Sequence, residues 1–507
     1  MKLLRTLTSA TAAAALAVGA LTTPIASAGH APETRWPNNV APADRLSTIE
    51  ELDIEQEAQK YFKRDDNGEF IVEDGNFISN PPDHLKWLTP AYNKRKNVKF
   101  LTATSPAMDG AKVNLAVITP TGNFDRSRPT IYLLNGAGGA EQGIDWLVMT
   151  DGEKGNTNLI DFYIKKDVNV VVVQDGAFSY YTDWVNAPKT DYLDTKQMWE
   201  TFLIKELPGP LEHHINGNGK RAIAGMSMSA TSALLLAEHN PGFYDAVGSY
   251  SGCAATSTPM PWLYTSLTVQ RGGATPEQMW GPRGGAYSRF NDALINSNNL
   301  RGAHVYVSTS TGLPGENEML SSFLQNGNTN LSSAFKSSST VTIEGGAIEA
   351  AMYDCTTQLK RKMDREGIPA DWNFRPTGTH SWPGWKEDIW KSWNTYAKAF
   401  GQPEGYGEDP NRGIVPAPAP ALRSAVDPTA EKTVTELNLA DLKNLPADIL
   451  PGTADAPNAD AAPTAPAAPA AAAAPAAPAP AAPAGPTSGA PAPAPEVVAP
   501  APAPTGA

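Results

Sequence analysis

The segment that decides the fold is Ala222-Ile223-Ala224-Gly225-Met226-Ser227-Met228-Ser229-Ala230. An apolar run typical of a buried strand leads into a Gly-x-Ser-x-small motif, and the helix-forming run Ala230–Glu238 follows at once. In such a nucleophile elbow the serine sits on a tight, strained turn, so the residues two positions away must be small. The second small residue here is Ser229 rather than glycine. The segment predicts Ser227 as a nucleophile, the alternative being a serine that only caps the helix.

Short β-branched runs alternate with longer amphipathic runs on both sides of this segment. The expected strands are Lys112–Ile118, Thr130–Leu134, Val168–Val173, Arg221–Ala224, Ala246–Ser249, His304–Ser308 and Asp371–Phe374. The expected helices are Thr195–Ile215, Met228–His239, Ala347–Glu366 and Trp385–Phe400. This alternation predicts a mostly parallel sheet with helices on both faces, and together with the elbow it predicts an α/β-hydrolase fold. The apolar runs Ile131–Leu134 and Val170–Val173 are typical of central strands buried on both faces.

The composition separates a folding segment from a tail. Hydrophobic residues make up 41% of the chain, which is enough for a large core. Of the 45 prolines, 21 lie between Gly413 and the C-terminus, and the last aromatic residue is Tyr406. An Ala/Pro-rich tail of this kind cannot build a core and favours extended, disordered conformers. The net charge of −13 excludes a generic basic nucleic-acid binder.

The N-terminus has the pattern of an export signal. Lys2 and Arg5 precede the apolar run Ala10–Leu21, and Ala26-Ser27-Ala28 resembles a cleavage site. That run is shorter than the roughly 20 residues a bilayer requires, and we expect no transmembrane segment. We therefore expect a secreted protein with a signal peptide (1–28), an N-terminal extension (29–85) containing a helix near Ile49–Phe62, an α/β-hydrolase catalytic domain (86–403) and a disordered Pro/Ala-rich tail (404–507).

A serine hydroxyl needs a base to take its proton, which directs attention to the seven histidines. His380 follows the last expected strand and precedes a helix, the position where the hydrolase fold carries its histidine. The other six lie in the N-terminal extension, in expected helices or at the start of a strand: His30, His84, His213, His214, His239 and His304. The pattern therefore predicts His380 as the catalytic base.

The third member of a triad is an acid between the serine and the histidine in chain order. Glu316 and Glu318 follow the strand His304–Ser308, the usual hydrolase position. Glu344 and Glu349 lie at the start of the next long helix, where a carboxylate also benefits from the positive helix end. Spacing alone leaves these four acids open.

An oxyanion hole needs two backbone N–H groups aimed at the carbonyl oxygen as it becomes negative. The residue after the nucleophile, Met228, would supply one. The glycine-rich loop Leu134–Gly139 follows an early central strand and would supply the other. This loop lacks both the Lys-Ser/Thr of a P-loop and the Gly-x-Gly-x-x-Gly spacing, which argues against phosphate binding.

The two cysteines, Cys253 and Cys355, suggest one disulfide in an exported protein, the alternative being two buried free thiols. Two cysteines are too few for a cysteine-built zinc site. We expect no metal and no cofactor.

Several segments together resemble the antigen 85-type mycolyltransferases, exported acyltransferases of mycolate-walled bacteria. The matching segments appear in family order over about 95–403: Ile131–Gly136, Tyr181–Trp184, Gly225–Ala230 and Gly378–Trp382 with Trp385. The last of these motifs is the most specific.

The resemblance implies an acyltransferase with Ser227 as nucleophile and His380 as base. It also selects Glu349 as the acid and places Ala137 and Met228 at the oxyanion-hole positions. We expect Asn135 and Trp382 to contact the substrate. Asn135 stands where the family has a sugar-contacting carboxylate, and Gly138 stands where it has a nearby arginine, which leaves the choice of acceptor open.

The implied reaction moves a mycoloyl group from one trehalose monomycolate to another, which forms the dimycolate, or onto a cell-wall sugar. A Cys253–Cys355 disulfide would pin the helix that carries the acid. The expected partners are trehalose mycolates and cell-wall glycans, and the enzyme is expected to be a monomer in the cell envelope. The alternatives are a secreted carboxylesterase, which the same triad would serve with water as acceptor, and a non-catalytic cell-wall adhesin.

Overall fold

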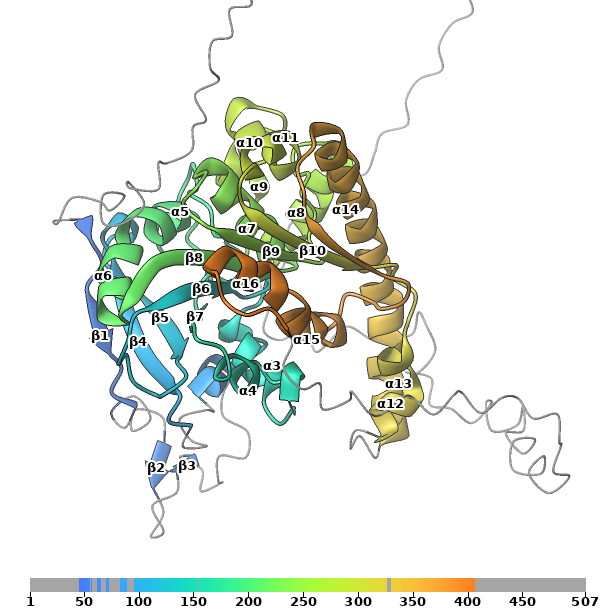
Figure 1. Ribbon diagram of the computed structural model, residues 1–507. Coiled ribbons are helices and arrows are strands. Elements are labelled where there is room, and N and C mark those ends of the chain that lie inside the picture. The colour runs from blue at the N-terminus through green and yellow to red at the C-terminus, as the bar shows by residue number, and fades with distance from the viewer. Residues whose placement is uncertain are drawn as a thin grey trace, which may run out of the picture. The chain divides into compact units, whose positions relative to one another are not determined.

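The computed structural model describes residues 45–54, 56, 62–64, 70–72, 83–88, 95–153, 155–325 and 330–405. This part of the chain is built around one nine-stranded sheet (Figure 1). In sheet order the strands are β1 (Ile49–Glu51), β4 (Val98–Ser105), β5 (Ala111–Ile118), β7 (Asn169–Val173), β6 (Arg128–Leu134), β8 (Gly217–Met226), β9 (Ala246–Tyr250), β10 (His304–Ser310) and β11 (Asp371–Arg375). A short separate hairpin pairs β2 (Phe62–Arg64) with β3 (Phe70–Val72).

The sheet has a parallel and an antiparallel part. All pairings from β7 through β6, β8, β9 and β10 to β11 are parallel. The pairings β1–β4, β4–β5 and β5–β7 are antiparallel. The carboxyl ends of the parallel strands meet at one edge, which is where ligands bind in open α/β sheets. The prediction of a mostly parallel α/β-hydrolase sheet is confirmed.

Helices cover both faces of the sheet. One face carries α3 (Trp146–Thr150), α4 (Leu159–Tyr163), α15 (Trp382–Lys391) and α16 (Trp393–Phe400). The other carries α5 (Trp199–Thr201), α6 (Pro208–His214), α7 (Met228–His239), α8 (Pro259–Arg271), α9 (Pro276–Trp280), α11 (Ala293–Asn296) and α14 (Gly346–Glu366). The remaining described α-helices are α10 (Ala286–Phe290), α12 (Leu320–Gln325) and α13 (Leu331–Thr340).

The central strands divide their side chains between two apolar cores. Ile131 and Leu133 belong to the core under α15 and α16, whereas Tyr132 and Leu134 belong to the core under α7. The valines of β7 alternate in the same way. Because successive side chains of a strand point to opposite faces, an uninterrupted apolar run satisfies both cores. The prediction that these strands are buried on both faces is confirmed.

The expected strands and helices of 112–400 are present, with two interruptions. A π-helical segment, Phe202–Glu206, and Pro208 break the helix expected over Thr195–Ile215. Ser392 separates α15 from α16 within the run expected to be one helix.

The helix expected near Ile49–Phe62 is wrong at both ends. Ile49–Glu51 form β1, whose residues pair with Leu101–Ala103 of β4, and Phe62 begins β2. Of the described residues between these strands, Ile54 and Gln56 are helical. Pairing with Ile49–Glu51 satisfies the backbone N–H and C=O groups at the edge of β4. A prediction from local helix propensity does not include this distant contact.

The signal peptide expected at 1–28 lies outside the described residues, as does the tail from Tyr406 onward. Within the described ranges, no helix is both long enough and apolar enough to cross a membrane.

Candidate active site

The strand β8 ends in the expected elbow. Ser227 has φ 56° and ψ −120°, a strained backbone conformation for a residue with a side chain. A Cβ on Gly225 would lie 2.3 Å from the carbonyl oxygen of Ser229, so only glycine fits there. The backbone N–H of Ser227 donates to Tyr250 O at 2.8 Å, which ties the turn to the neighbouring strand β9.

Ser229, the second small residue of the elbow, has a structural position. It is fully buried in the first turn of α7, and its Oγ donates to Leu134 O (3.2 Å) or Met226 O (3.1 Å). The same oxygen accepts from the backbone N–H of Met226. Ser229 therefore holds the elbow against the end of β6 and does not point at the pocket.

The loop between β11 and α15 brings His380 to the elbow. Its Nε2 lies 2.8 Å from Ser227 Oγ, and its Nδ1 lies 2.8 Å from Glu349 Oε2. Because a carboxylate accepts and does not donate, Nδ1–H donates to Glu349 and Nε2 is left to accept from the serine hydroxyl. The ring packs edge-to-face on Trp385 with centroids 5.1 Å apart, which gives this residue of the Gly378–Trp385 motif a positioning role.

Glu349 lies in the first turn of α14, is fully buried and is held on both carboxylate oxygens. Oε2 faces His380, while Oε1 accepts from Ser251 Oγ (2.8 Å), Thr309 Oγ1 (3.1 Å) and the backbone N–H of Ser310 (2.6 Å). A buried carboxylate is stable only with such partners. The three donors come from the carboxyl ends of β9 and β10, so the sheet itself fixes the acid.

The other acids that spacing left open lie elsewhere. Glu316 is exposed in the turn after β10, and Glu344 is exposed in the π-helical segment Val341–Gly345. Glu318 is buried and accepts from Gly315 N and Ser381 Oγ, so it supports the residue next to His380. Glu349 is the acid that contacts His380.

The two expected oxyanion donors lie on the wall of the same pocket as Ser227. Met228 is the first residue of α7, so its N–H has no acceptor within the helix. Ala137 lies in the loop after β6, where its carbonyl accepts from Phe178 N at 2.8 Å. Neither N–H donates to an acceptor in the described part of the chain. Both are available to an oxyanion.

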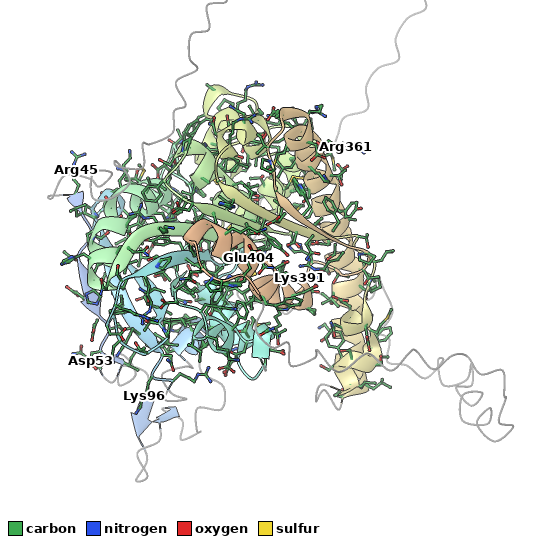
Figure 2. The ribbon with its side chains drawn as sticks, viewed as in Figure 1. Arg45, Asp53, Lys96, Arg361, Lys391 and Glu404 are labelled. Atoms are coloured by element: carbon green, nitrogen blue, oxygen red, sulfur yellow. A yellow bond between two sulfur atoms is a disulfide. The ribbon has the colours of Figure 1, made fainter. Side chains whose placement is uncertain are left out.

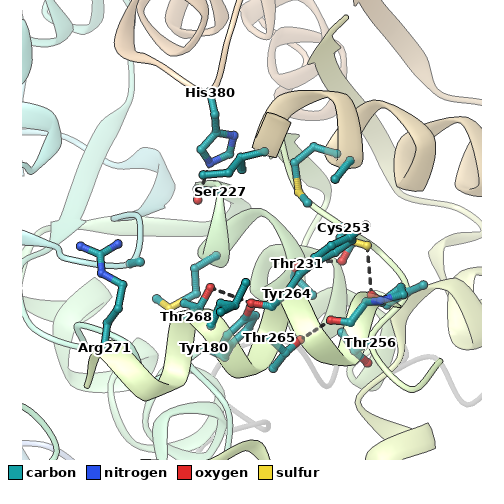
Figure 3. A pocket seen from close by; sticks show the side chains of 18 of the residues that line it. Tyr180, Ser227, Thr231, Cys253, Thr256, Tyr264, Thr265, Thr268, Arg271 and His380 are labelled. Carbon is teal, nitrogen blue, oxygen red and sulfur yellow. Dashed lines mark hydrogen bonds between the residues drawn. The ribbon is translucent and has the colours of Figure 1, made fainter. Parts of the chain in front are cut away.

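A pocket of about 370 Å³ opens beside Ser227 and His380 (Figure 3). Residues of α8 form one wall, among them the labelled Tyr264, Thr265 and Thr268. The opposite wall is formed by the start of α14, with Ala347, Ile348, Ala351 and Met352. These walls are largely apolar, as a site for a hydrocarbon chain requires. Most of the residues that form them belong to no catalytic motif, so no sequence pattern predicted their role.

Cys253 and Cys355 form a disulfide, as expected from the even cysteine count. Cys253 lies in the loop after β9, and Cys355 lies in α14, six residues after Glu349. Thr231 Oγ1 of α7 donates to Cys253 O at 2.8 Å. The bridge thus joins α14 to the loop that contacts α7, the helix that follows Ser227.

The two residues expected to contact substrate do not line this pocket. Asn135 is fully buried, and its amide donates to Val173 O while its carbonyl accepts from Trp146 N. It therefore holds the loop after β6 in place, which does not fit the expected contact. Trp382 is half-buried and packs edge-to-face on Trp146 and Trp385. A role for Trp382 toward substrate stays a prediction.

A half-buried acid, Glu141, supports the loop after β6 and was not singled out from the sequence. Its Oε1 accepts from Gly176 N (2.9 Å) and Ala177 N (3.0 Å), while its Oε2 is buried without a partner. Burial, together with the nearby Asp175 carboxylate, raises the pKa of Glu141 to about 8. A protonated carboxyl still accepts both N–H bonds, so this acid joins the loops after β6 and β7.

Within the described residues, no group of three His, Cys, Asp or Glu side chains is arranged to hold a metal ion.

The model of the putative esterase family matches residues 105–393, more than half of the chain. The chain belongs to the putative esterase family. Its match includes Ser227, Glu349 and His380, and the prediction of an enzyme of the serine-hydrolase type is confirmed.

Curated relatives narrow the resemblance within the putative esterase family. The diacylglycerol acyltransferase/mycolyltransferase Ag85A of Mycobacterium gordonae is 29% identical over 302 residues, which cover 58% of this chain and 78% of that protein. Ag85C of Mycobacterium leprae is 28% identical over 271 residues, covering 51% and 71%. The resemblance to antigen 85-type mycolyltransferases is confirmed. Among solved structures, Mycobacterium tuberculosis MPT51 (FbpC1) matches with a TM-score of 0.45 and 20% identity, covering 58% of this chain and 96% of that one.

Proposed function

We propose that this protein is an acyltransferase that moves mycoloyl groups between trehalose esters, or onto cell-wall sugars, through an acyl-enzyme on Ser227. The observation that carries this proposal is the hydrogen-bonded series Ser227–His380–Glu349 at the mouth of an apolar pocket. The antigen 85-type relatives, named as mycolyltransferases, support the substrate class.

In the first half-reaction Ser227 Oγ attacks the ester carbonyl carbon of the acyl donor, and its proton passes to His380 Nε2. Glu349 fixes the imidazole in the required tautomer and stabilises its positive charge. The carbonyl oxygen becomes negative and accepts from the N–H groups of Ala137 and Met228. When the carbon–oxygen bond to the sugar breaks, His380 returns the proton to the departing sugar oxygen.

The second half-reaction reverses these steps with another sugar. Its hydroxyl gives a proton to His380 Nε2 as its oxygen attacks the acyl carbon on Ser227. The tetrahedral intermediate again uses the two N–H donors, and its collapse breaks the bond to Ser227 Oγ, which takes the proton back from His380. Acyl donor and acceptor thus use one set of residues in turn.

The pocket fits an acyl donor with a long hydrocarbon chain. Its walls from α8 and α14 offer apolar contacts at a distance from the reacting atoms. The guanidinium-bearing Arg271 also lines this pocket. It donates to Gln142 Oε1, and Gln142 Nε2 in turn donates to Tyr192 Oη. This linked set offers hydrogen bonds to sugar hydroxyls near the oxyanion loop.

We place the enzyme outside the cytoplasm, in the cell envelope. The expected signal at 1–28 and the disulfide Cys253–Cys355 support this location, because disulfides persist in oxidising compartments.

A carboxylesterase is the second candidate function, favoured by the putative esterase family. It would use the same first half-reaction, with water replacing the second sugar.

The deciding experiment incubates the wild-type protein, the Ser227→Ala variant and a Ser127→Ala control with trehalose monomycolate. Ser127 is exposed and precedes β6, so its variant controls for effects of mutation and purification that are unrelated to the site. We expect dimycolate from wild type and control and none from Ser227→Ala. Free mycolic acid without dimycolate would favour the esterase. Equal behaviour of all three proteins would reject catalysis by Ser227.

A further inference from the structure

The acid-bearing helix is longer than its catalytic part. The helix α13, the π-helical segment Val341–Gly345 and α14 follow one another without a break, since Val341, Gly345 and Gly346 all have right-handed helical backbones. Figure 1 shows α14 alongside the sheet and α13 beyond it. In agreement, α14 packs on β10, while α13 packs on α12 and the π-helical segment.

The outlying part exposes large apolar side chains at regular spacing. Leu331, Phe335 and Ile343 are 60%, 43% and 64% exposed. Together with Ser339 they occupy every fourth position of the helix from 331 to 343. Residues four apart share one face of a helix, so these side chains form a stripe. The next position in the series is Ala347, which lines the acyl pocket. Ile348, the residue after Ala347, is 47% exposed and lines the same pocket. We call Leu331, Phe335, Ile343 and Ile348 the α13 stripe.

A second apolar stripe reaches the pocket from the other wall. On α8, Met260, Leu263 and Leu267 are between 46% and 58% exposed, and their i, i+3, i+7 spacing places them on one face. Leu267 of this helix and Ile348 of the α13 stripe both line the pocket. The exposed apolar surface is therefore continuous with the pocket at both walls.

Charge is sparse around the α13 stripe. Residues 319–343 contain one charged side chain, Lys336, whereas α14 contains eight in 21 residues. Figure 2 shows Arg361, on the charged portion of α14, pointing outward. Exposed apolar stripes that lead to one pocket from two helices mark a surface that a partner covers.

We propose that the α13 stripe and the α8 stripe dock the enzyme on an uncharged lipid layer, the layer from which the acyl chain enters the pocket. This proposal rests on the proposed function, because the pocket it serves is the acyl pocket. Both stripes lead to the pocket, so an acyl chain passes from the lipid to Ser227 along apolar surface. The sparse charge favours a neutral lipid layer over an anionic one, to which a basic surface would be attracted.

The test is flotation of the full-length mature protein with phosphatidylcholine vesicles that contain trehalose monomycolate. The variant Leu331→Ser/Phe335→Ser/Ile343→Ser removes apolar contact without touching Ser227, Glu349 or His380. We expect its vesicle-bound fraction to fall at least tenfold, because apolar burial is the main attraction. A matched variant at the charged part of the same helix, Arg361→Ser/Arg365→Ser, should bind as wild type does.

Catalysis is followed with two substrates to separate docking from chemistry. A soluble short-chain ester should be cleaved by the triple variant with unchanged kcat/KM, which also shows that it folds. The vesicle-borne substrate should show a raised apparent KM. If no substrate is turned over by wild type while vesicle binding still depends on the stripe, the proposed function fails and the docking surface stands.

Three results would overturn the docking proposal. The first is equal vesicle binding by the triple variant and wild type. The second is a wild-type dimer that the triple variant converts to a monomer, because the stripe would then contact a second copy. The third is vesicle binding that appears only after residues 413–507 are removed, because the tail would then cover the stripe.

Discussion

The two parts of the helix from Leu331 to Glu366 are built for opposite surroundings. In α14, Glu349 and Cys355 are buried, and every oxygen of the acid has a partner. In α13, Leu331 and Phe335 are exposed and the single charge is Lys336. The buried part places a charge where water is excluded, and the exposed part places apolar groups where water is present.

If both proposals hold, one continuous helix serves catalysis through Glu349 and substrate supply through the α13 stripe. The π-helical segment between the two parts also binds the catalytic loop, since Gly345 O accepts from His380 N at 2.9 Å. π-Helical turns are often found at functional sites. The acid, the histidine loop and the outlying stripe are therefore held by one continuous element.

The largest effect we predict separates Glu349 from Glu344, five residues before it. In Glu349→Gln, the amide oxygen would occupy the Oε1 position with its three donors, so the amide NH₂ would face His380 Nδ1. This favours the wrong imidazole tautomer, and we expect kcat to fall about 10³- to 10⁴-fold, as such a change does in serine proteases. Steady-state kinetics on a soluble ester measures it.

The exposed Glu344 provides the matched control. Glu344→Gln should retain kcat within about twofold, because its side chain is exposed on the π-helical segment. Equal kinetics of the two variants would remove Glu349 from the catalytic assignment.

The sequence was sufficient for the residues whose role depends on a local pattern. The elbow around Ser227 needs glycine at 225, and the parallel strands need unbroken apolar runs, so both leave a signature in consecutive residues. Glu349 does not, because its role depends on donors from Ser251, Thr309 and Ser310, far away in the chain. Spacing left four acids open, and the family resemblance selected among them.

Other features depended on contacts that no short segment contains. β1 forms because β4 offers an open edge, not because Ile49–Glu51 favour a strand by themselves. Asn135 matches a position that contacts sugar in the family, yet both of its polar groups are used inside the fold. The acyl pocket is similarly assembled from α8 and α14, which are separated by a long stretch of chain.

The next prediction concerns the disulfide that joins α14 to the loop after β9. Cys253 and Cys355 close a loop with a sequence separation of 102. By loop-closure entropy, Cys253→Ser/Cys355→Ser should lower the free energy of unfolding by about 4–5 kcal/mol. Because Glu349 is six residues away on the same helix, we also expect kcat to fall roughly tenfold through misplacement of the acid.

Chemical denaturation and ester kinetics measure these two effects separately. Wild type treated with a mild reductant supplies the comparison, with free thiols counted to show that the bridge is open. Full activity after complete reduction would show that the sheet alone positions the acid.

A smaller effect is predicted for Glu141, which is half-buried where Glu349 is fully buried, and whose buried Oε2 has no hydrogen-bond partner. Its pKa is raised to about 8 by burial and by Asp175, so the folded protein holds a proton that the unfolded chain releases above its ordinary pKa. Stability contributed by this group therefore falls as pH rises from about 5 to about 8. Glu141→Gln keeps an acceptor for Gly176 N and Ala177 N and removes the titration.

We expect the melting temperature of Glu141→Gln to exceed that of wild type by a few degrees at pH 8, with the gap shrinking toward pH 5. Thermal unfolding across this pH range measures the difference. Glu277→Gln, an exposed change in α9, is the control and should follow wild type at each pH. A gap that is constant with pH would mean that the variant acts through packing rather than through the proton.

The smallest effect is predicted for removal of residues 413–507, the Pro/Ala-rich part of the chain, which belongs to neither part of the helix compared above. The chain is tied to the folded body as far as Gly405, whose O accepts from Lys166 Nζ at 2.9 Å and whose N–H donates to Asn394 Oδ1 at 2.8 Å. Gln402 donates to Asp167 O at 2.6 Å. We expect truncation after Arg412 to leave kcat/KM for a soluble ester within about twofold and to change where the enzyme resides, as cell fractionation would measure. Truncation after Phe400 should lower the melting temperature, because it removes these contacts. Loss of activity in the protein truncated after Arg412 would show that catalysis also needs residues beyond the last described helix, α16.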